Sequence, residues 1–225
     1  MRTMASAVAR LVFTAFFLHG ALAPAQQVPE VAGQLFAPLD VSDSIPVSIV
    51  DLTGGSGSAG VDDAQLARWA LEDWSRALDG QLRFHVVDDE GAATIRVRFV
   101  PPGGGQYGEM LQLRIGEKRG AAVFVRPDTE ALGSVIAGRA ARDPLYRETI
   151  VYLTCVHELG HALGLAHTSD YADIMYAFGF GGDVEEYFMR FRRQIDVRDD
   201  LRGLSGLSDS DRARVRALYS LEAEQ

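Results

Sequence analysis

Three histidines and one glutamate lie within a short stretch of the sequence, His157-Glu158-Leu-Gly-His161-Ala-Leu-Gly164-Leu-Ala-His167. Spaced four residues apart, His157 and His161 lie one turn apart on the same face of a helix, so their imidazoles can bind one cation. Because Gly164 lacks a Cβ, it can adopt the left-handed conformation that ends the helix and turns the chain back, which brings His167 to the same cation. Three imidazoles that leave one position open are typical of a catalytic zinc site.

Glu158 is the candidate catalytic residue. It lies about 100° around the helix from His157, beside the metal rather than on it. From there its carboxylate can act as a general base, which accepts a proton from zinc-bound water and delivers it to the leaving amine of a peptide bond. The alternative is a helix that carries these residues by chance, for which ordinary residue frequencies give a probability on the order of 10⁻⁵.

A methionine follows this motif. Met175 comes eight residues after His167, in the stretch Asp-Ile-Met175-Tyr176. Most methionines only fill space in the core, but an extended zinc motif followed by a methionine in a tight turn is the metzincin arrangement. The chain thus resembles the metzincin clan and, within it, the matrixins, which are matrix metalloprotease-like peptidases. A looser resemblance to matrixin helices and strands extends over residues 70–75, 93–99 and 207–219.

The resemblance implies an α+β fold of the metzincin, or zincin-like, type. This catalytic domain has a twisted, mainly parallel five-stranded sheet with an antiparallel edge strand, an active-site helix and a small C-terminal helical subdomain. The resemblance also implies a zinc endopeptidase that acts on a protein or peptide, with one catalytic zinc and with Met175 packed beneath the three imidazoles. Astacins and serralysins place a zinc-reaching tyrosine one residue later than Tyr176, so we expect no fifth protein ligand.

The sequence departs from the matrixin pattern at the second metal site. Matrixins hold a structural zinc through His and Asp, but outside the motif the chain after residue 25 offers only His85. We therefore expect one zinc and no second one. The acidic loops leave Ca²⁺ binding open, although neither an EF-hand spacing nor glycine-rich nonapeptides support it.

The segment after the methionine also departs from the family, because matrixins have proline where this chain has Ala177. The residues here and on the preceding helix predict an apolar pocket for the side chain that follows the scissile bond. None of them carries a charge, so a charged side chain would be left unpaired in this pocket. The candidate pocket residues are Leu153, Tyr176, Ala177 and Phe178, within a wall formed by residues 176–180.

Hydrophobic periodicity predicts the elements that position these residues. A peptide substrate is expected to pair with an edge strand at residues 111–115. The helix at 183–195 has no counterpart in matrixins, and both a packing role and a substrate-facing role stay open for it. Strands are predicted at residues 46–52, 82–87, 94–100, 111–115 and 121–125, with a glycine-rich loop at 101–108. The last two strands flank residues 116–120 and form a predicted hairpin whose register stays open. Helices are predicted at 62–78, 144–163, 183–195 and 208–219; Asp143 before Pro144 is the start signal of the second, and Ser208 with Asp211 forms a capping box at the start of the fourth.

Composition limits the partners of the protein. The chain has 225 residues, of which 47% are hydrophobic and 24% charged, which is typical of one globular domain. Its formal net charge is −9, and no basic run is interleaved with aromatic residues. We therefore expect no nucleic acid and no anionic membrane as a partner, and a monomeric protein.

Residues 1–25 have the pattern of a signal peptide. Arg2 and Arg10 precede an apolar stretch at 11–22, which is followed by Ala-Pro-Ala25. The stretch is too short for a membrane anchor, which needs roughly 20 apolar residues. We expect a secreted or periplasmic protein without a membrane anchor after cleavage, with an extended segment at 26–45 and the catalytic domain at 46–225.

Cys155 is the single cysteine, so the chain can form no internal disulfide. It precedes His157 by two residues and points away from the zinc-facing side of the helix, so we expect a buried structural thiol. Latency by a cysteine switch is not expected, because residues 26–45 contain no cysteine. Asp40 or Asp43 of this segment is the alternative ligand for a latent state.

Two other functions compete with a general secreted endopeptidase. One is a peptidase of narrow specificity that processes a single envelope or secreted partner. The other is a catalytically silent binding module that zinc only stabilises. The presence of Glu158 argues against silence, because a structural role needs the histidines and not the base.

Overall fold

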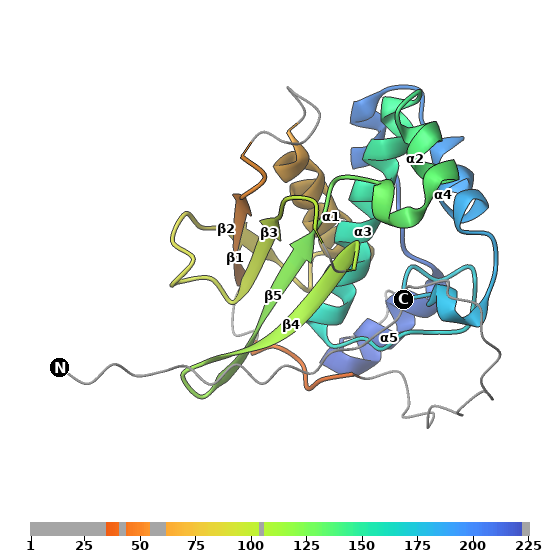
Figure 1. The fold of residues 1–225 in the computed structure, drawn as a ribbon. Helices are drawn as coiled ribbons and strands as arrows, with labels where there is room; N and C mark the ends of the chain where they lie inside the picture. Colours follow the sequence, from red (N-terminus) through yellow and green to blue (C-terminus); the bar gives the residue numbers. More distant parts are fainter. Residues whose placement is uncertain (1–34, 41–43, 55–61, 104–105, 222–225) are drawn as a thin grey trace, which may run out of the picture.

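The computed structural model describes residues 35–40, 44–54, 62–103 and 106–221 (Figure 1). The signal peptide expected at 1–25 and most of the extended segment expected at 26–45 lie outside the described residues. No helix in the described part of the chain is long and apolar enough to cross a membrane.

A five-stranded sheet forms one layer of the structure (Figure 1). Four strands run parallel to one another, and the edge strand β4 runs antiparallel to its neighbour β5. The predicted, mainly parallel sheet with an antiparallel edge strand is therefore confirmed. In the order β2-β1-β3-β5-β4, the strands are β2 (Phe84–Val86), β1 (Ile45–Asp51), β3 (Ile95–Phe99), β5 (Lys118–Val125) and β4 (Gly108–Ile115).

The hairpin of β4 and β5 is longer than predicted. Gly116 has a φ of +59°, and this left-handed residue allows a two-residue turn that pairs Ile115 with Lys118. From this turn the ladder extends to Gly108, which lies opposite Val125. The predicted hairpin is therefore present with the register that the sequence left open: residues 118–120 belong to β5, and β4 begins three residues before the predicted residue 111. At the other edge, β2 is shorter than predicted because it pairs with β1 over only three residues.

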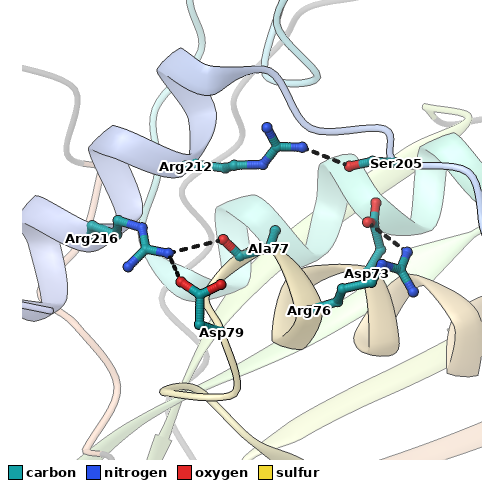
Figure 2. Close-up of a pocket in the computed structure, with 7 residues that line it drawn as sticks. All are labelled: Asp73, Arg76, Ala77, Asp79, Ser205, Arg212 and Arg216. Atoms are coloured by element: carbon teal, nitrogen blue, oxygen red, sulfur yellow. Dashed lines mark hydrogen bonds and ion pairs between the residues drawn. The ribbon is translucent and has the colours of Figure 1, made fainter. Parts of the chain in front are cut away.

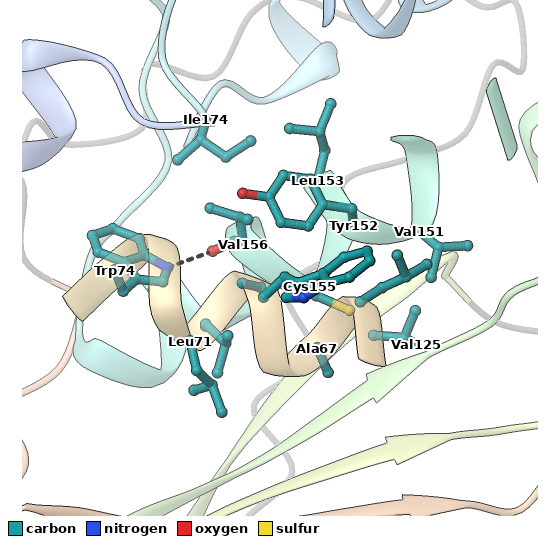
Figure 3. Packing of buried hydrophobic residues seen from close by; sticks show 14 of the residues in the cluster. Ala67, Leu71, Trp74, Val125, Val151, Tyr152, Leu153, Cys155, Val156 and Ile174 are labelled. Carbon is teal, nitrogen blue, oxygen red and sulfur yellow. Dashed lines mark hydrogen bonds between the residues drawn. The ribbon is translucent and has the colours of Figure 1, made fainter. Parts of the chain in front are cut away.

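Helices α1 (Asp63–Ala77) and α3 (Pro144–Leu163) pack against one face of the sheet and against each other (Figure 1). The two ends of α3 are as predicted: the Asp143 carboxylate accepts a hydrogen bond from the Tyr146 N–H (3.2 Å), and Gly164 ends the helix with a φ of +115°. Figure 3 shows the core between these layers, where Trp74 of α1 donates its Nε1–H to the Val156 carbonyl of α3 (3.0 Å). This packing fixes the helix that carries two of the predicted metal ligands.

The chain after α3 adds α4 (Val184–Arg192) and α5 (Asp209–Tyr219). The α5 helix begins with the predicted capping box, in which Ser208 and Asp211 exchange hydrogen bonds between side chain and backbone. The α4 helix ends at Arg192, before the predicted residue 195, and packs against α3. Four short elements had no prediction: the helix α2 (Ser134–Ala140), which also packs against α3, and the 3₁₀ helices η1 (Glu130–Leu132), η2 (Phe178–Phe180) and η3 (Arg198–Arg202).

Candidate functional site

The three histidines of the motif meet at one point. His157 and His161 lie one turn apart on α3, and the left-handed Gly164 turns the chain so that His167 approaches both. The Nε2 atom of His167 lies 3.2 Å from that of His157 and 3.0 Å from that of His161. In the described part of the chain, this is the only group of three or more His, Cys, Asp or Glu side chains close enough to hold one metal ion.

Backbone carbonyls fix the tautomers of the two histidines on α3. The Nδ1 atom of His157 lies 2.6 Å from the Ile174 carbonyl, and that of His161 lies 2.8 Å from the Leu165 carbonyl. A carbonyl oxygen only accepts hydrogen bonds, so each Nδ1 must carry the proton and donate it. Both Nε2 atoms therefore present lone pairs toward the common point, which is how histidine ligands are held around a metal.

The spacing of these nitrogens fits zinc. Two ligands of a tetrahedral zinc ion with Zn–N bonds of 2.0–2.1 Å are separated by about 3.3 Å. The observed separations of 3.0 and 3.2 Å are close to this value. The three imidazoles thus have the donor type, the orientation and the spacing that zinc requires.

Burial keeps the three imidazoles neutral. It lowers the pKa of His157, lowers that of His161 well below its ordinary value, and lowers that of His167 to about 3. Repulsion by neighbouring imidazoles adds to burial at His161 and His167. A neutral imidazole has the free lone pair that a metal ligand needs.

Glu158 lies beside the cluster and against the start of β4. Its Oε1 atom lies 2.5 Å from the position that a Cβ on Gly108 would occupy, so only a glycine at 108 leaves room for the carboxylate. The side chain is 6% exposed. Burial, followed by repulsion from Glu109, raises the pKa of Glu158 to about 8.

The turn that contains Met175 is tied to both the third histidine and α5. The residue after His167, Thr168, donates its N–H to the Met175 carbonyl (2.8 Å). One residue before Met175, the Ile174 N–H donates a hydrogen bond to the Asp211 carboxylate of α5 (2.8 Å). The Ile174 carbonyl accepts the hydrogen bond from His157 Nδ1. The turn therefore supports His157 directly and His167 through its neighbour in the chain, and Met175 itself is fully buried.

A small apolar cavity of about 40 Å³ opens next to His157 and Glu158. Of the four candidate pocket residues, Leu153, Tyr176 and Phe178 line it, whereas Ala177 does not. Phe180, at the end of the wall segment, is also absent from the lining, and its side chain is 62% exposed. Besides His157 and Glu158, seven residues that were not predicted as pocket also line it: Tyr107, Gly108, Leu132, Thr154, Ile174, Tyr187 and Phe188.

These additional residues gave little signal in the sequence. Gly108 is the last residue of a glycine-rich stretch that is typical of a loop. Its contact with Glu158 depends on the pairing of β4 with β5, which the sequence does not predict as far as residue 108. Tyr187 and Phe188 belong to the helix predicted at 183–195, for which the sequence allows both a packing role and a substrate-facing role. Their place in the cavity lining depends on the packing of α4 against α3.

A larger hollow of about 410 Å³ lies between α1 and α5 (Figure 2). It shares no residue with the histidine cluster. Its arginines already have partners: Arg76 pairs with Asp73, Arg216 pairs with Asp79, and Arg212 donates to Ser205. The hollow is therefore a polar groove between two helices, and the pair of Arg216 with Asp79 is the ion pair among these that links its two sides.

Three further predicted residues lie outside the site. Cys155 is fully buried between α1 and α3 (Figure 3), and burial raises the pKa of its thiol well above the ordinary value. Asp40 forms an ion pair with Lys118 (2.6 Å) and does not reach the cluster, while Asp43 lies outside the described residues. His85 lies on β2, where its Nδ1 is 2.7 Å from the Ser44 hydroxyl.

Comparison with known proteins supports the resemblance. Residues 58–184 match peptidase family M10, the matrixins. Among solved structures, the chain is similar to one described as "Structure of myroilysin", with 17% sequence identity and a TM-score of 0.42 over 80% of this chain and 94% of that chain. Because the matrixin match covers more than half of the chain, the protein belongs to the matrixin family and is a metalloendopeptidase of the metzincin type.

Proposed function

We propose that the protein is a secreted zinc endopeptidase, in which His157, His161 and His167 hold one zinc ion and Glu158 is the general base. The convergence of three neutral imidazoles with a carboxylate beside them is the observation that carries the proposal. Zinc, when bound, supplies Lewis acidity toward a peptide carbonyl and toward water. It is the metal that the family implies.

The role of Glu158 follows from its position. Glu158 directly follows His157 in α3, but its carboxylate faces Gly108 at the start of β4. The carboxylate therefore lies beside the histidine cluster and is not part of it. It accepts a proton from the attacking water and delivers this proton to the amine nitrogen as the C–N bond breaks. No other described carboxylate, thiol or imidazole outside the three ligands lines the cavity next to the cluster.

The edge strand suits an extended peptide as substrate. β4 pairs with β5 on one side, and no described strand pairs with its other side. A peptide can use these backbone groups to add a strand, with alternate side chains turned toward the protein. Because β4 begins at Gly108 beside Glu158, such a peptide would reach the cluster at this end of the strand.

The proposal includes the expected organisation of the chain, with a signal peptide at 1–25, an extended segment at 26–45 and the catalytic domain at 46–225. N-terminal sequencing of the protein exported from its native cells or from a bacterial host would test the signal peptide. A first residue at position 26 is expected, and a retained Met1 in the exported protein would contradict the proposal.

The activity is tested by incubating the purified protein with casein and with a mixed peptide library, with and without a chelator. Cleavage that stops on chelation and returns with Zn²⁺ is expected, while the Glu158→Gln variant should bind zinc and cleave at least about 10²-fold more slowly. Zinc binding without hydrolysis by the wild type would leave the silent binding module as the function. Cleavage at a single sequence would indicate the narrow processing peptidase.

A further inference from the structure

We propose that helix α4 closes the apolar cavity beside the histidine cluster and so restricts the residue after the scissile bond to small aliphatic side chains, alanine and valine above all. The inference rests on the proposed peptidase function for its substrate, but the closure itself is a property of the chain that can be tested separately. Its central residue is Phe188, with Tyr187 beside it.

The cavity runs from the cluster along α3 toward α4. His157 and Glu158 line it at the cluster, and Leu153 and Thr154 line it one helical turn further toward the start of α3. Apart from Glu158 and His157, no titratable group other than buried tyrosine lines it. A side chain that enters from the cluster therefore meets an apolar interior.

The size of the cavity sets the size of this side chain. Its volume is about 40 Å³. An apolar cavity that binds benzene has a volume of about 150 Å³, so this cavity is too small for an aromatic ring. Alanine and valine side chains are the smaller apolar groups that suit a cavity of this size, and a phenylalanine side chain does not.

A row of aromatic rings forms the wall. From Tyr176, next to the methionine turn, the row continues to Phe178, with 5.4 Å between ring centroids, and from Phe178 to Phe188, with 6.2 Å. Tyr187 packs edge-on against both Phe178 (5.0 Å) and Phe188 (5.5 Å). The two rings of α4 thus extend the wall that the segment after Met175 begins.

Hydrogen bonds and ion pairs hold this wall in place. The Tyr187 hydroxyl donates to the Asp173 carbonyl (2.8 Å), two residues before Met175. Arg190 stacks on the Tyr187 ring at 4.1 Å and donates to the Tyr171 carbonyl (2.7 Å). At the end of α4, Arg192 donates to the Asp143 carboxylate that caps α3 (2.8 Å). Because α4 is fixed to the methionine turn and to α3, the wall cannot move away without breaking these contacts.

The first experiment profiles cleavage of a peptide library that varies the residue after the scissile bond. The wild type is expected to prefer alanine and valine over phenylalanine by about tenfold or more in kcat/KM, and Phe188→Ala should shift the preference toward leucine and phenylalanine by a similar factor. Phe180→Ala is the matched control, because it makes the same change on an exposed ring outside the cavity. A wild type that prefers phenylalanine, or a Phe188→Ala profile equal to the wild type, would overturn the inference.

The second experiment needs no hydrolysis. Benzene binds to dry apolar cavities of sufficient size, and binding to the folded state raises the Tm. In the chelated full-length protein, benzene should raise the Tm of Phe188→Ala and leave the wild type and Phe180→Ala unchanged. Benzene binding by Phe188→Ala in a protein that cleaves no peptide would refute the proposed function and still support the closure.

Leu132→Ala is the second variant. Leu132 lines the same cavity from η1 and is only partly buried, so its truncation should be tolerated if Phe188→Ala fails to fold. It should likewise admit benzene and larger side chains. If neither folded variant binds benzene or changes the cleavage profile, α4 does not close the cavity.

Discussion

Met175 lies directly against the backbone of Gly160, and its sulfur fills the space into which a side chain at position 160 would project. Trp74 borders the same space, with a ring carbon 3.1 Å from the position of the added Cβ. Gly160 stands between His157 and His161 on α3, so the methionine supports the part of the helix that carries both. Met175 can therefore pack against this turn of α3 only because residue 160 is glycine.

Gly160→Ala should destabilise the protein and weaken its metal binding. In a free helix this change stabilises by about 1 kcal/mol, but here the methyl group overlaps Met175, and overpacking of this kind costs about 1–3 kcal/mol. Thermal unfolding and a zinc titration would measure both effects. Gly138→Ala in α2 is the control, because its Cβ meets only Arg142 at 3.6 Å, and a stabilised Gly160→Ala variant would contradict the predicted overlap.

Removal of the metal should lower the Tm, since an ion bound only to the folded state stabilises that state. Replacing His157, His161 or His167 by alanine should have the same effect and should reduce the zinc content, measured by mass spectrometry of the purified protein. His85→Ala should leave the zinc content unchanged. A ligand variant that retains one zinc per chain would remove that histidine from the proposed site.

Glu158→Gln should separate metal binding from turnover. The amide keeps the shape of the side chain but cannot accept the proton, so turnover should fall by about 10²-fold or more with zinc still bound. Peptide hydrolysis and metal content measured on the same sample test this. Hydrolysis at the wild-type rate would refute the proposed general base.

Gly108→Ala should lower turnover by displacing the Glu158 carboxylate. The added methyl group would lie 2.5 Å from Oε1 and 2.7 Å from a Thr154 carbon, so one of the side chains must shift. The zinc content should not change, because the three atoms nearest to the added methyl group belong to Glu158 and Thr154 and not to a histidine. Gly103→Ala is the control, because it makes the same glycine-to-alanine substitution in the preceding loop. A Cβ at residue 103 would have no atom within 4 Å.

The ion pair of Glu90 and Arg98 should make a small contribution to stability that is lost in acid. Hydrogen bonds from Arg98 (2.8 and 3.2 Å) hold the pKa of Glu90 below its ordinary value of 4.5. A carboxyl with a lowered folded-state pKa stabilises the protein above its unfolded-state pKa, and this contribution disappears as the pH falls through the folded-state value. The pair is partly exposed, so less than about 1 kcal/mol is expected. In Arg98→Gln the Glu90 pKa, measured by NMR titration, should rise, and an unchanged value would contradict the assignment.

The sequence predicted the ligand helix and its ends because the signals are local. Asp143 before Pro144 and the glycine at 164 each determine the conformation of adjacent residues, and the four-residue spacing of His157 and His161 places them on one face. The start of β4 and the helix α2 were missed for the opposite reason. Gly108 becomes a strand residue only by pairing with Val125, and α2 begins at Ser134 after Gly133, an N-cap residue that has no side chain to cap the helix. The position of Phe188 in the cavity wall also could not be predicted, because it depends on packing between segments far apart in the chain.

If a peptide substrate pairs with β4 as proposed, the edge of β4 that no described strand covers has a consequence for which proteins can be cut. Its backbone groups accept only a chain that is straight over several residues, and a helix or a paired strand already uses its own backbone groups internally. A folded substrate must therefore expose a loop or unravel locally before it fits, at a free-energy cost set by its own local stability. The local stability of a substrate protein therefore limits its cleavage before the side-chain pocket can select among residues. Among proteins with identical cleavable sequences, the least stable ones are degraded first.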